Sequence, residues 1–403
     1  MGKTRPDKKQ KKKGGISRAA DGNDNSADQT DKQQISPLYL VSVAEELIQA
    51  GNAPDAFTIA KQALDASQPT SDGALASLNL LGQISLELGD FDGARTYFLR
   101  AVSIDQDGQR SDDVGGGAEK FMCLAQLSEE GGADSVRWFE RGAGALKTQI
   151  QKAEEKASQQ TLRKQQQQEE AAAALDELRR KHAMCLCAVA EIYMTDLSWE
   201  ADAEQRCEAL VTEATMTAPD SAESWQTLAN VRISQARLED ARAALTRSME
   251  IWRGLPTADP SVPDFPSRVS LARLLMEVEM EQEALEVLER LIGEDDHSVE
   301  VWYLGGWSLY VLGDKQKTEK QGEEDEWKLN WFSSRTWLNQ CLKLFNKQEY
   351  EDERLGEHAN ELLIGIAKEL GVEPVMADDE EAEDADEGDW EDDEADDDDE
   401  MEE

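Results

Sequence analysis

The sequence predicts an all-α protein built as an array of paired helices. Apolar residues recur at three- and four-residue spacing from Pro37 almost to Leu370, with very little of the two-residue alternation typical of strands. Small residues recur within these patterns about every 34 residues. A length of 403 residues suits such an array, which grows in one direction and needs no single large core.

The first 35 residues are predicted to be a disordered basic segment. They lack aromatic residues and are rich in Lys, Asp, Gln, Ser and Gly, so they bury too little apolar surface to offset the entropy of ordering. The run KKQKKKGG is typical of a nuclear-import signal or of a solvated tail, and both interpretations stay open. Helical structure is expected to begin at Ser36-Pro37, a capping residue followed by proline.

Residues 36–373 carry the spacing of the tetratricopeptide repeat (TPR), a unit of two antiparallel helices about 34 residues long. The best copy starts at Leu75 and places the expected residues at positions 4, 7, 8, 20, 24 and 27: Leu78, Leu81, Gly82, Ala94, Phe98 and Ala101. Other copies start at Pro37, Ala118, Ala183, Ala222, Phe265 and Val299. The sequence therefore predicts a TPR superhelix (α-solenoid) of about seven repeats, closed by a C-terminal capping helix from Leu355 to Leu370.

Four segments depart from the repeat period. Residues 106–117 and 255–266 are predicted loops because of their Gly and Pro content. Residues 146–181 are rich in Gln, Glu, Lys and Ala, which favours long helices projecting from the body. Residues 314–327 are expected to form a protruding charged loop, and residues 374–403 a disordered acidic tail.

The net charge of the chain indicates which class of partner it can bind. Lys and Arg number 42 against 86 Asp and Glu, a formal net charge of −44 that repels polyanions. We therefore expect a basic protein partner and no direct nucleic-acid contact. No apolar stretch is long enough for a membrane span, and five scattered cysteines do not suggest a disulfide framework.

Catalytic chemistry has little support. The sequence lacks GxxxxGK[ST], GxGxxG and GxSxG. His182 precedes Cys185 and Cys187, but helical residues two apart point in nearly opposite directions, so joint metal ligation is not expected. We predict that the protein is not an enzyme, with no catalytic residues, metal or cofactor.

The predicted binding surface is the concave face, which in TPR arrays is lined by positions 2, 5, 9, 12 and 13 of each first helix. Those positions contain nine Glu and one basic residue, Arg273. Carboxylates spaced in this way can pair with Lys and Arg of an extended ligand, although a chance bias in an acidic protein is the alternative. The predicted client-binding residues are Glu45, Asn79, Gln83, Glu87, Glu119, Met122, Gln126, Glu130, Glu191, Glu223, Asn230, Glu277, Tyr303, Trp307 and Tyr310.

Two of these groups have more specific expectations. Asn79 and Asn230 are expected to be available to the backbone of the ligand. Tyr303, Trp307 and Tyr310 form one helical stripe, for which core packing and ligand stacking are both open interpretations. The acidic tail either keeps the chain soluble or screens basic surface on a client.

The opening MGKTRPDKKQKKKGG, the degenerate TPR array over residues 37–370 and the ending DEGDWEDDEADDDDE together resemble the fungal dedicated assembly chaperones of large-subunit ribosomal protein four. The resemblance implies a chaperone that holds the client's long basic internal loop in its concave face until assembly into pre-ribosomes. We expect the chain to be a monomer. The resemblance further implies a location in nucleus and cytoplasm, and contact with a nuclear import receptor and the pre-ribosome. A histone chaperone and a TPR scaffold or adaptor are the alternatives.

Overall fold

The computed structural model describes residues 36–159, 165–319 and 326–372. The predicted basic segment 1–35 and acidic tail 374–403 lie outside these residues. The described residues form fifteen α-helices, one 3-10 helix (η1, Asp112–Val114) and no strand. The helices are α1 (Pro37–Gln49), α2 (Ala53–Ala66), α3 (Asp72–Glu87), α4 (Phe91–Ile104), α5 (Glu119–Gln126), α6 (Gly132–Gln159), α7 (Gln165–Met194), α8 (Ala203–Thr217), α9 (Ala222–Ser234), α10 (Leu238–Trp252), α11 (Phe265–Glu277), α12 (Glu281–Ile292), α13 (Val299–Glu319), α14 (Glu326–Gln348) and α15 (Glu353–Leu370).

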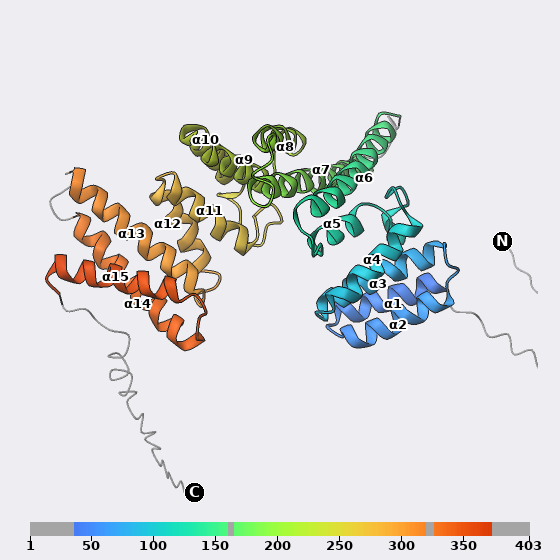
Figure 1. Ribbon diagram of the computed structural model, residues 1–403, viewed down its shortest axis with the longest axis horizontal. Helices are drawn as coiled ribbons and strands as arrows, with labels where there is room; N and C mark the ends of the chain where they lie inside the picture. Colours follow the sequence, from blue (N-terminus) through green and yellow to red (C-terminus); the bar gives the residue numbers. More distant parts are fainter. Residues whose placement is uncertain (1–35, 160–164, 320–325, 373–403) are drawn as a thin grey trace, which may run out of the picture.

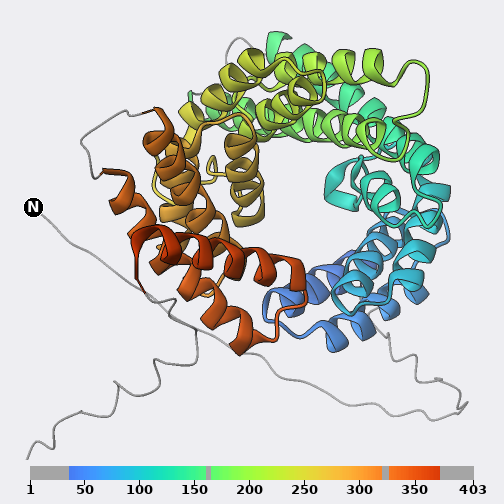
Figure 2. The same cartoon turned by 60° about the vertical axis from the view of Figure 1, so that its left-hand side comes forward.

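Helices α1 to α14 form seven successive pairs, and α15 packs on the last pair. The pairs follow one another in a curved row, and the two ends of the row lie well apart (Figure 1). Seen from another direction, the row of helices curves around a central space (Figure 2). First helices of neighbouring repeats contact one another, α1 with α3, α7 with α9 and α11 with α13. This confirms the predicted TPR superhelix with its capping helix.

The small residues of the repeat lie where two helices cross closely. A Cβ atom on Gly82 of α3 would come within 2.6 Å of Cζ of Phe98 on α4. On Gly306 of α13, it would come within 2.6 Å of Cγ of Leu338 on α14. The buried apolar residues form several clusters along the array, such as one over α1 to α3 and another over α9 to α13. Stability is therefore built from contacts between neighbouring repeats.

In the described residues 146–159 and 165–181, the predicted extension consists of continuations of α6 and α7, whose ends stand away from the rest of the array (Figure 1). Arg179 of α7 donates to Glu154 of α6 at 2.8 Å across this hairpin. The described part of the tip is almost wholly exposed, as its Gln- and Glu-rich sequence requires.

The expectation of a charged loop at 314–327 is wrong for the part that the structure describes. Helix α13 continues to Glu319 and α14 begins at Glu326. Contacts to other helices hold this helical extension: Lys315 donates to Glu281 at 2.7 Å, and Lys317 donates to Glu369 of α15 at 2.5 Å. The sequence pattern could not show these pairs, because each partner lies more than thirty residues away.

Residues 255–264 lie in the expected connection between α10 and α11, whereas Phe265 and Pro266, which were also expected in the loop, form the first turn of α11. Helix α15 ends as expected at Gly371, whose φ of 68° suits a residue without a Cβ atom. Within the described ranges, none of the helices combines the length and the apolar character needed to cross a membrane.

Candidate functional site

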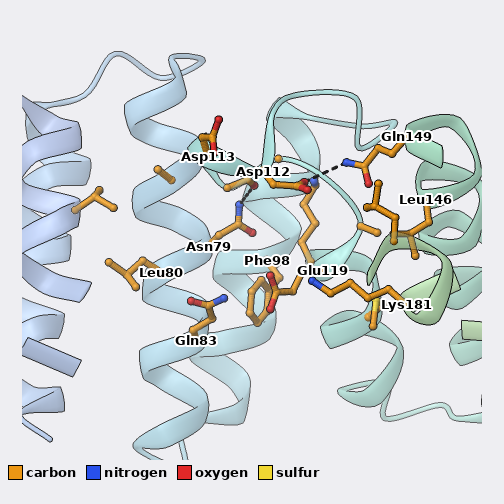
Figure 3. Close-up of a pocket in the computed structure, with 18 of the residues that line it drawn as sticks. Asn79, Leu80, Gln83, Phe98, Asp112, Asp113, Glu119, Leu146, Gln149 and Lys181 are labelled. Atoms are coloured by element: carbon orange, nitrogen blue, oxygen red, sulfur yellow. Dashed lines mark hydrogen bonds between the residues drawn. The ribbon is translucent and has the colours of Figure 1, made fainter. Parts of the chain in front are cut away.

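A cavity of about 420 Å³ opens among α1, α3, α5, α7 and the loop before α5, and we call it the N-terminal cavity. Five of the predicted binding residues line it: Glu45, Asn79, Gln83, Glu119 and Met122. They come from three successive first helices, so the repeat frame correctly brings them together. Figure 3 shows Asn79, Gln83 and Glu119 facing one hollow from both sides. Apolar walls are added by Leu80, Leu146, Leu178 and Met184.

The lining of the N-terminal cavity is acidic. Its four carboxylates belong to Glu45, Asp112, Asp113 and Glu119, and all four side chains are exposed. Of its two lysines, Lys120 is buried and paired with Asp105, which lies outside the lining. Lys181 pairs with Glu177 at 3.7 Å. Negative charge therefore remains in excess at the surface that a ligand would meet.

The acids Asp112 and Asp113 reach the cavity through the loop between α4 and α5, which the repeat positions do not include. Gln149 of α6 donates to Asp112 at 3.1 Å, and Ser111 donates to Asp113 at 3.0 Å. The signal that could have found them is the acidic pair inside a Gly-rich insertion next to a concave helix. Sequence reasoning missed them because it counted first-helix positions alone.

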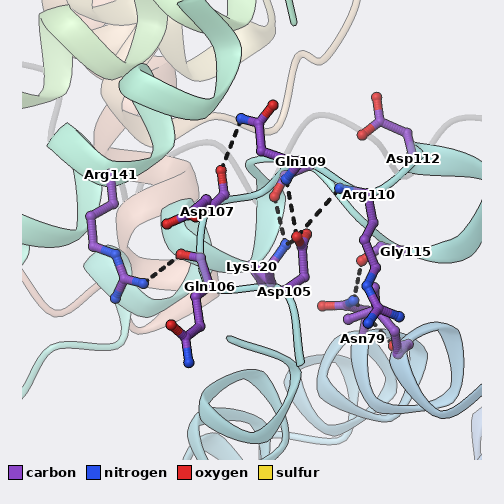
Figure 4. A network of polar contacts seen from close by, with 12 residues as sticks. Asn79, Asp105, Gln106, Asp107, Gln109, Arg110, Asp112, Gly115, Lys120 and Arg141 are labelled. Carbon is purple, nitrogen blue, oxygen red and sulfur yellow. Dashed lines mark hydrogen bonds and ion pairs between the residues drawn. The ribbon is translucent and has the colours of Figure 1, made fainter. Parts of the chain in front are cut away.

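A buried ion pair closes this loop at its base (Figure 4). Lys120 Nζ donates to Asp105 Oδ2 at 2.8 Å and to the carbonyl oxygen of Gly117 at 2.6 Å. Asp105 Oδ1 accepts the backbone N–H groups of Gln109 at 3.0 Å and Arg110 at 3.3 Å. The pair therefore joins the start of the loop to its end and to α5.

Burial acts on the pKa values of both partners of this ion pair. Burial works to raise the pKa of Asp105, but Lys120 and the two backbone N–H groups outweigh it, and the pKa lies below its usual value. The pKa of Lys120 is lowered because burial disfavours the ammonium more than Asp105 stabilises it. The Asp105 carboxylate is thus held ionised by Lys120 and the two backbone N–H groups.

Asn79 has a different role from the expected one. Its Nδ2 donates to the carbonyl oxygen of Leu75 at 3.2 Å and to that of Gly115 in the loop. Its amide donors are therefore used within the chain, where they fix the loop against α3. Arg110 adds a second anchor, since it donates to Asp72 at 3.0 Å and to the carbonyl oxygen of Thr70 at 3.1 Å.

Two predicted acids, Glu191 of α7 and Glu223 of α9, lie together in the middle of the array. Thr227 Oγ1 joins them, at 3.4 Å from Glu191 Oε1 and 3.2 Å from the carbonyl oxygen of Glu223. Groups packed around Glu191 remove part of its hydration and raise the pKa of its carboxyl, although its side chain is still accessible. Burial first, and then these two acids, raise the pKa of neighbouring Cys187 to about 11.

A second cavity of about 610 Å³ lies among α11, α13 and the start of α15, and we call it the C-terminal cavity. Glu277, Tyr303 and Trp307 line it, so part of the aromatic stripe does face the concave side. Tyr303 also lies 2.7 Å from Nδ1 of His358 on α15. Tyr310 does not take part: its ring stacks on Trp331 of α14, with centroids 5.4 Å apart and planes 8° apart.

Tyr310 is thus a core-packing residue. Tyr303 and Trp307 line the cavity, where they remain accessible for ligand stacking. The reason for the packing of Tyr310 is the extension of α13 beyond the repeat length, which brings α14 over the side of the helix where Tyr310 lies.

The remaining predicted residues are spread along the array. Glu87 and Gln126 are exposed at the last positions of α3 and α5, and Asn230 is half-buried on α9. Glu130 is exposed in the turn between α5 and α6, not on a first helix, because α5 has only eight residues.

The cysteines and histidines carry no sign of a catalytic centre. Burial raises the pKa of Cys185 and of Cys341 to about 12, far from the range of a nucleophilic thiolate. Burial also lowers the pKa of His182. Asp295, Asp296 and His297 bring potential metal ligands within 4.8 Å of one another, but all three are exposed, and exposed acidic groups are common without an ion.

Comparison with known proteins agrees with the geometry. A family model for the tetratricopeptide repeat matches residues 44–109. A protein of Emericella nidulans described as a probable assembly chaperone of rpl4 is 44% identical over 402 residues, which cover 97% of each chain. A Schizosaccharomyces pombe protein of the same description is 32% identical over 352 residues, covering 87% of this chain and 96% of its own.

A solved structure of residues 1–338 of the assembly chaperone of RpL4 (Acl4) is 56% identical, with a TM-score of 0.66, and it covers 71% of this chain and 100% of its own. The resemblance drawn from the two ends and the repeat array is therefore confirmed. Identity above 30% over nearly the full length of both relatives shows that the chain belongs to the family of assembly chaperones of rpl4.

Proposed function

We propose that this chain is a dedicated chaperone of large-subunit ribosomal protein four (rpl4) and that it holds a basic, extended, RNA-binding segment of that protein against its concave face. The client is taken from the descriptions of the relatives. The observation that carries the mode of binding is the N-terminal cavity, where four exposed carboxylates surround a partly apolar hollow.

Charge and shape both suit a basic extended segment. Carboxylates spaced over α1, α5 and the η1 loop can each accept a charge-assisted hydrogen bond from a Lys or Arg side chain. Met122 and Met184 supply adaptable apolar contacts beside them. Complementary charge of this kind speeds association and makes it sensitive to salt. While bound, the basic segment would be kept from aggregation and from premature contact with RNA.

Two further aspects belong to the same proposal. The role is binding without catalysis, which is supported by the buried thiols and by the chaperone family. The chain works in both cytoplasm and nucleus, and travels with its client through a nuclear import receptor to the pre-ribosome. The Lys-rich run within residues 8–13 supports this route at the level of sequence.

A charge-reversal experiment tests the proposal. Glu45→Lys/Glu119→Lys changes two acids of the N-terminal cavity, and the control Asp65→Lys/Asp92→Lys changes two exposed acids of the second helices α2 and α4. Both variants change the net charge equally, so any effect of the overall field is matched. We expect the cavity variant to bind rpl4 about tenfold or more weakly, since two attractions of up to about 1 kcal/mol each become repulsions.

The control should stay within about twofold of the unmodified chain, because its acids lie away from the proposed surface. Equal losses in both variants would mean that only the net charge matters. Unchanged binding in the cavity variant would place the client elsewhere. Circular dichroism of each variant, with the unmodified chain alongside, establishes that the helices are intact.

A further inference from the structure

The C-terminal cavity has walls of a different character from the N-terminal one. Tyr303 and Trp307 form an aromatic side, and the other apolar lining residues are Met276, Leu304, Val311 and Leu355. Trp307 keeps 36% of its surface exposed although Tyr303 and His358 pack beside it, with ring centroids at 5.8 and 5.4 Å. A large, partly uncovered indole therefore faces the concave side of the last repeat.

Most of the acidic side chains that line this cavity already have partners within the chain. Glu281 accepts from Lys315, and Glu300 pairs with Arg273. Asp352 caps α15 by accepting the N–H groups of Arg354 at 3.2 Å and of Leu355 at 3.3 Å.

Glu277 is the exception among these carboxylates. It is exposed at the end of α11 and has no ion-pair partner within the ranges that the structure describes. Arg354 of α15 also lines the cavity, and its guanidinium is exposed, so water screens its charge. The aromatic wall is thus bordered by one free carboxylate.

We propose that the C-terminal cavity is a subsite for one arginine side chain of the bound client, with its guanidinium over Trp307 and its charge toward Glu277. The identity of the protein that supplies the arginine rests on the proposed function. The preference for a guanidinium rests only on the cavity itself.

The chemistry of the walls distinguishes arginine from the alternatives. An apolar side chain would cover Glu277 without giving it a partner, which is unfavourable for a charged group. A lysine ammonium is compact and strongly hydrated, so it loses more hydration free energy than a guanidinium does when it leaves water. A guanidinium is flat and weakly hydrated, stacks on aromatic faces and offers five donors to nearby acceptors. It therefore matches an aromatic wall that is bordered by a carboxylate.

The electrostatic state of Tyr303 supports the choice of a cation. Its pKa is raised to about 12, first because it is partly buried and then because Cys341 and the Asp352 carboxylate act on it, against a smaller opposing effect of Arg273. The wall beside Trp307 is therefore poorly hydrated. Poor hydration strengthens the attraction of a cation to an aromatic face.

The test uses small probes and does not depend on rpl4. The full chain is labelled with 5-fluorotryptophan, and Trp307→Phe identifies the ¹⁹F resonance of Trp307 among those of the ten tryptophans. The probes are the N-acetyl amides of arginine, citrulline and lysine. Citrulline is the matched control, since it keeps the planar shape of arginine and lacks its charge.

We expect the arginine probe to shift the Trp307 resonance at millimolar concentration, with at least threefold weaker binding of citrulline and lysine. Glu277→Gln should weaken arginine binding about two- to fivefold, as for an exposed ion pair. Glu289→Gln, an exposed acid on α12 outside the cavity lining, should leave it unchanged. A Trp307 resonance that does not move, or that responds equally to citrulline, would overturn the proposal.

The result separates the two proposals. A Trp307 resonance that responds to arginine in a chain that does not bind rpl4 would keep the subsite and reject the client. A Trp307 resonance that does not respond, in a chain that binds rpl4 at the N-terminal cavity, would reject the arginine subsite and keep rpl4 as the client.

Discussion

Replacing Lys120 by methionine should destabilise the junction of the second and third repeats. The Lys120 side chain is fully buried, and that of Asp105 is only 5% exposed. Methionine preserves much of the apolar stem of lysine but leaves the Asp105 carboxylate buried without its counter-charge. Removal of one partner from a buried pair costs about 3–5 kcal/mol. We therefore expect the free energy of unfolding to fall by about 3 kcal/mol.

A second variant isolates the electrostatic part of this cost. Asp105→Asn in the Lys120→Met background removes the orphaned charge and keeps a side-chain oxygen that can accept the N–H groups of Gln109 and Arg110. We expect it to recover about half of the lost stability or more. Urea unfolding at pH 7, followed by circular dichroism, measures both changes.

The reasoning fails if Lys120→Met costs less than about 1 kcal/mol, or if Asp105→Asn adds a further loss of similar size to the first. The same variant links stability to function. Since Lys120 closes the loop that carries Asp112 and Asp113, its loss should also weaken binding of rpl4 under conditions where the chain is folded.

Three other predictions concern packing, acid stability and thiols. Gly82→Ala should cost about 1–3 kcal/mol in urea unfolding because its Cβ meets Phe98, while Gly144→Ala, with nothing within 4 Å, should stabilise α6 by about 0.5–1 kcal/mol; equal effects would contradict this. Arg268 holds the pKa of Glu294 below its ordinary value of 4.5, so this stabilisation is present above that pH and lost as pH falls through the lowered pKa. In the Arg268→Met variant, the free energy of unfolding should fall less steeply as the pH decreases through this range, and an unchanged slope would contradict the prediction. All five native cysteines should react slowly with a thiol reagent at pH 8, because burial raises each pKa.

The repeat architecture was predictable because its signals are local. Gly82 and Phe98 lie sixteen residues apart in one repeat, and both are required by a single helix crossing. The same local frame correctly placed Glu45, Gln83 and Glu119 around one hollow. Positions of this kind follow from the helical period and from the contacts between neighbouring first helices.

The parts that the sequence did not predict depend on contacts between distant residues. The side-chain amide of Asn79 donates to the carbonyl oxygen of Gly115, which lies 36 residues later in an insertion outside the repeat pattern. Tyr310 packs on Trp331 because α13 and α14 extend past their repeat length. In both cases a residue has the right position for ligand binding, and a partner within the chain takes its interaction surface.

Photo-crosslinking from single positions tests most directly whether rpl4 is held against the concave face. A benzophenone side chain is introduced at Gln83, which lines the N-terminal cavity, or at Gln62, which is exposed on the second helix α2. We predict that irradiation of the complex links rpl4 to position 83 and leaves position 62 unlinked. Efficient crosslinking from position 62 with none from position 83 would contradict the account.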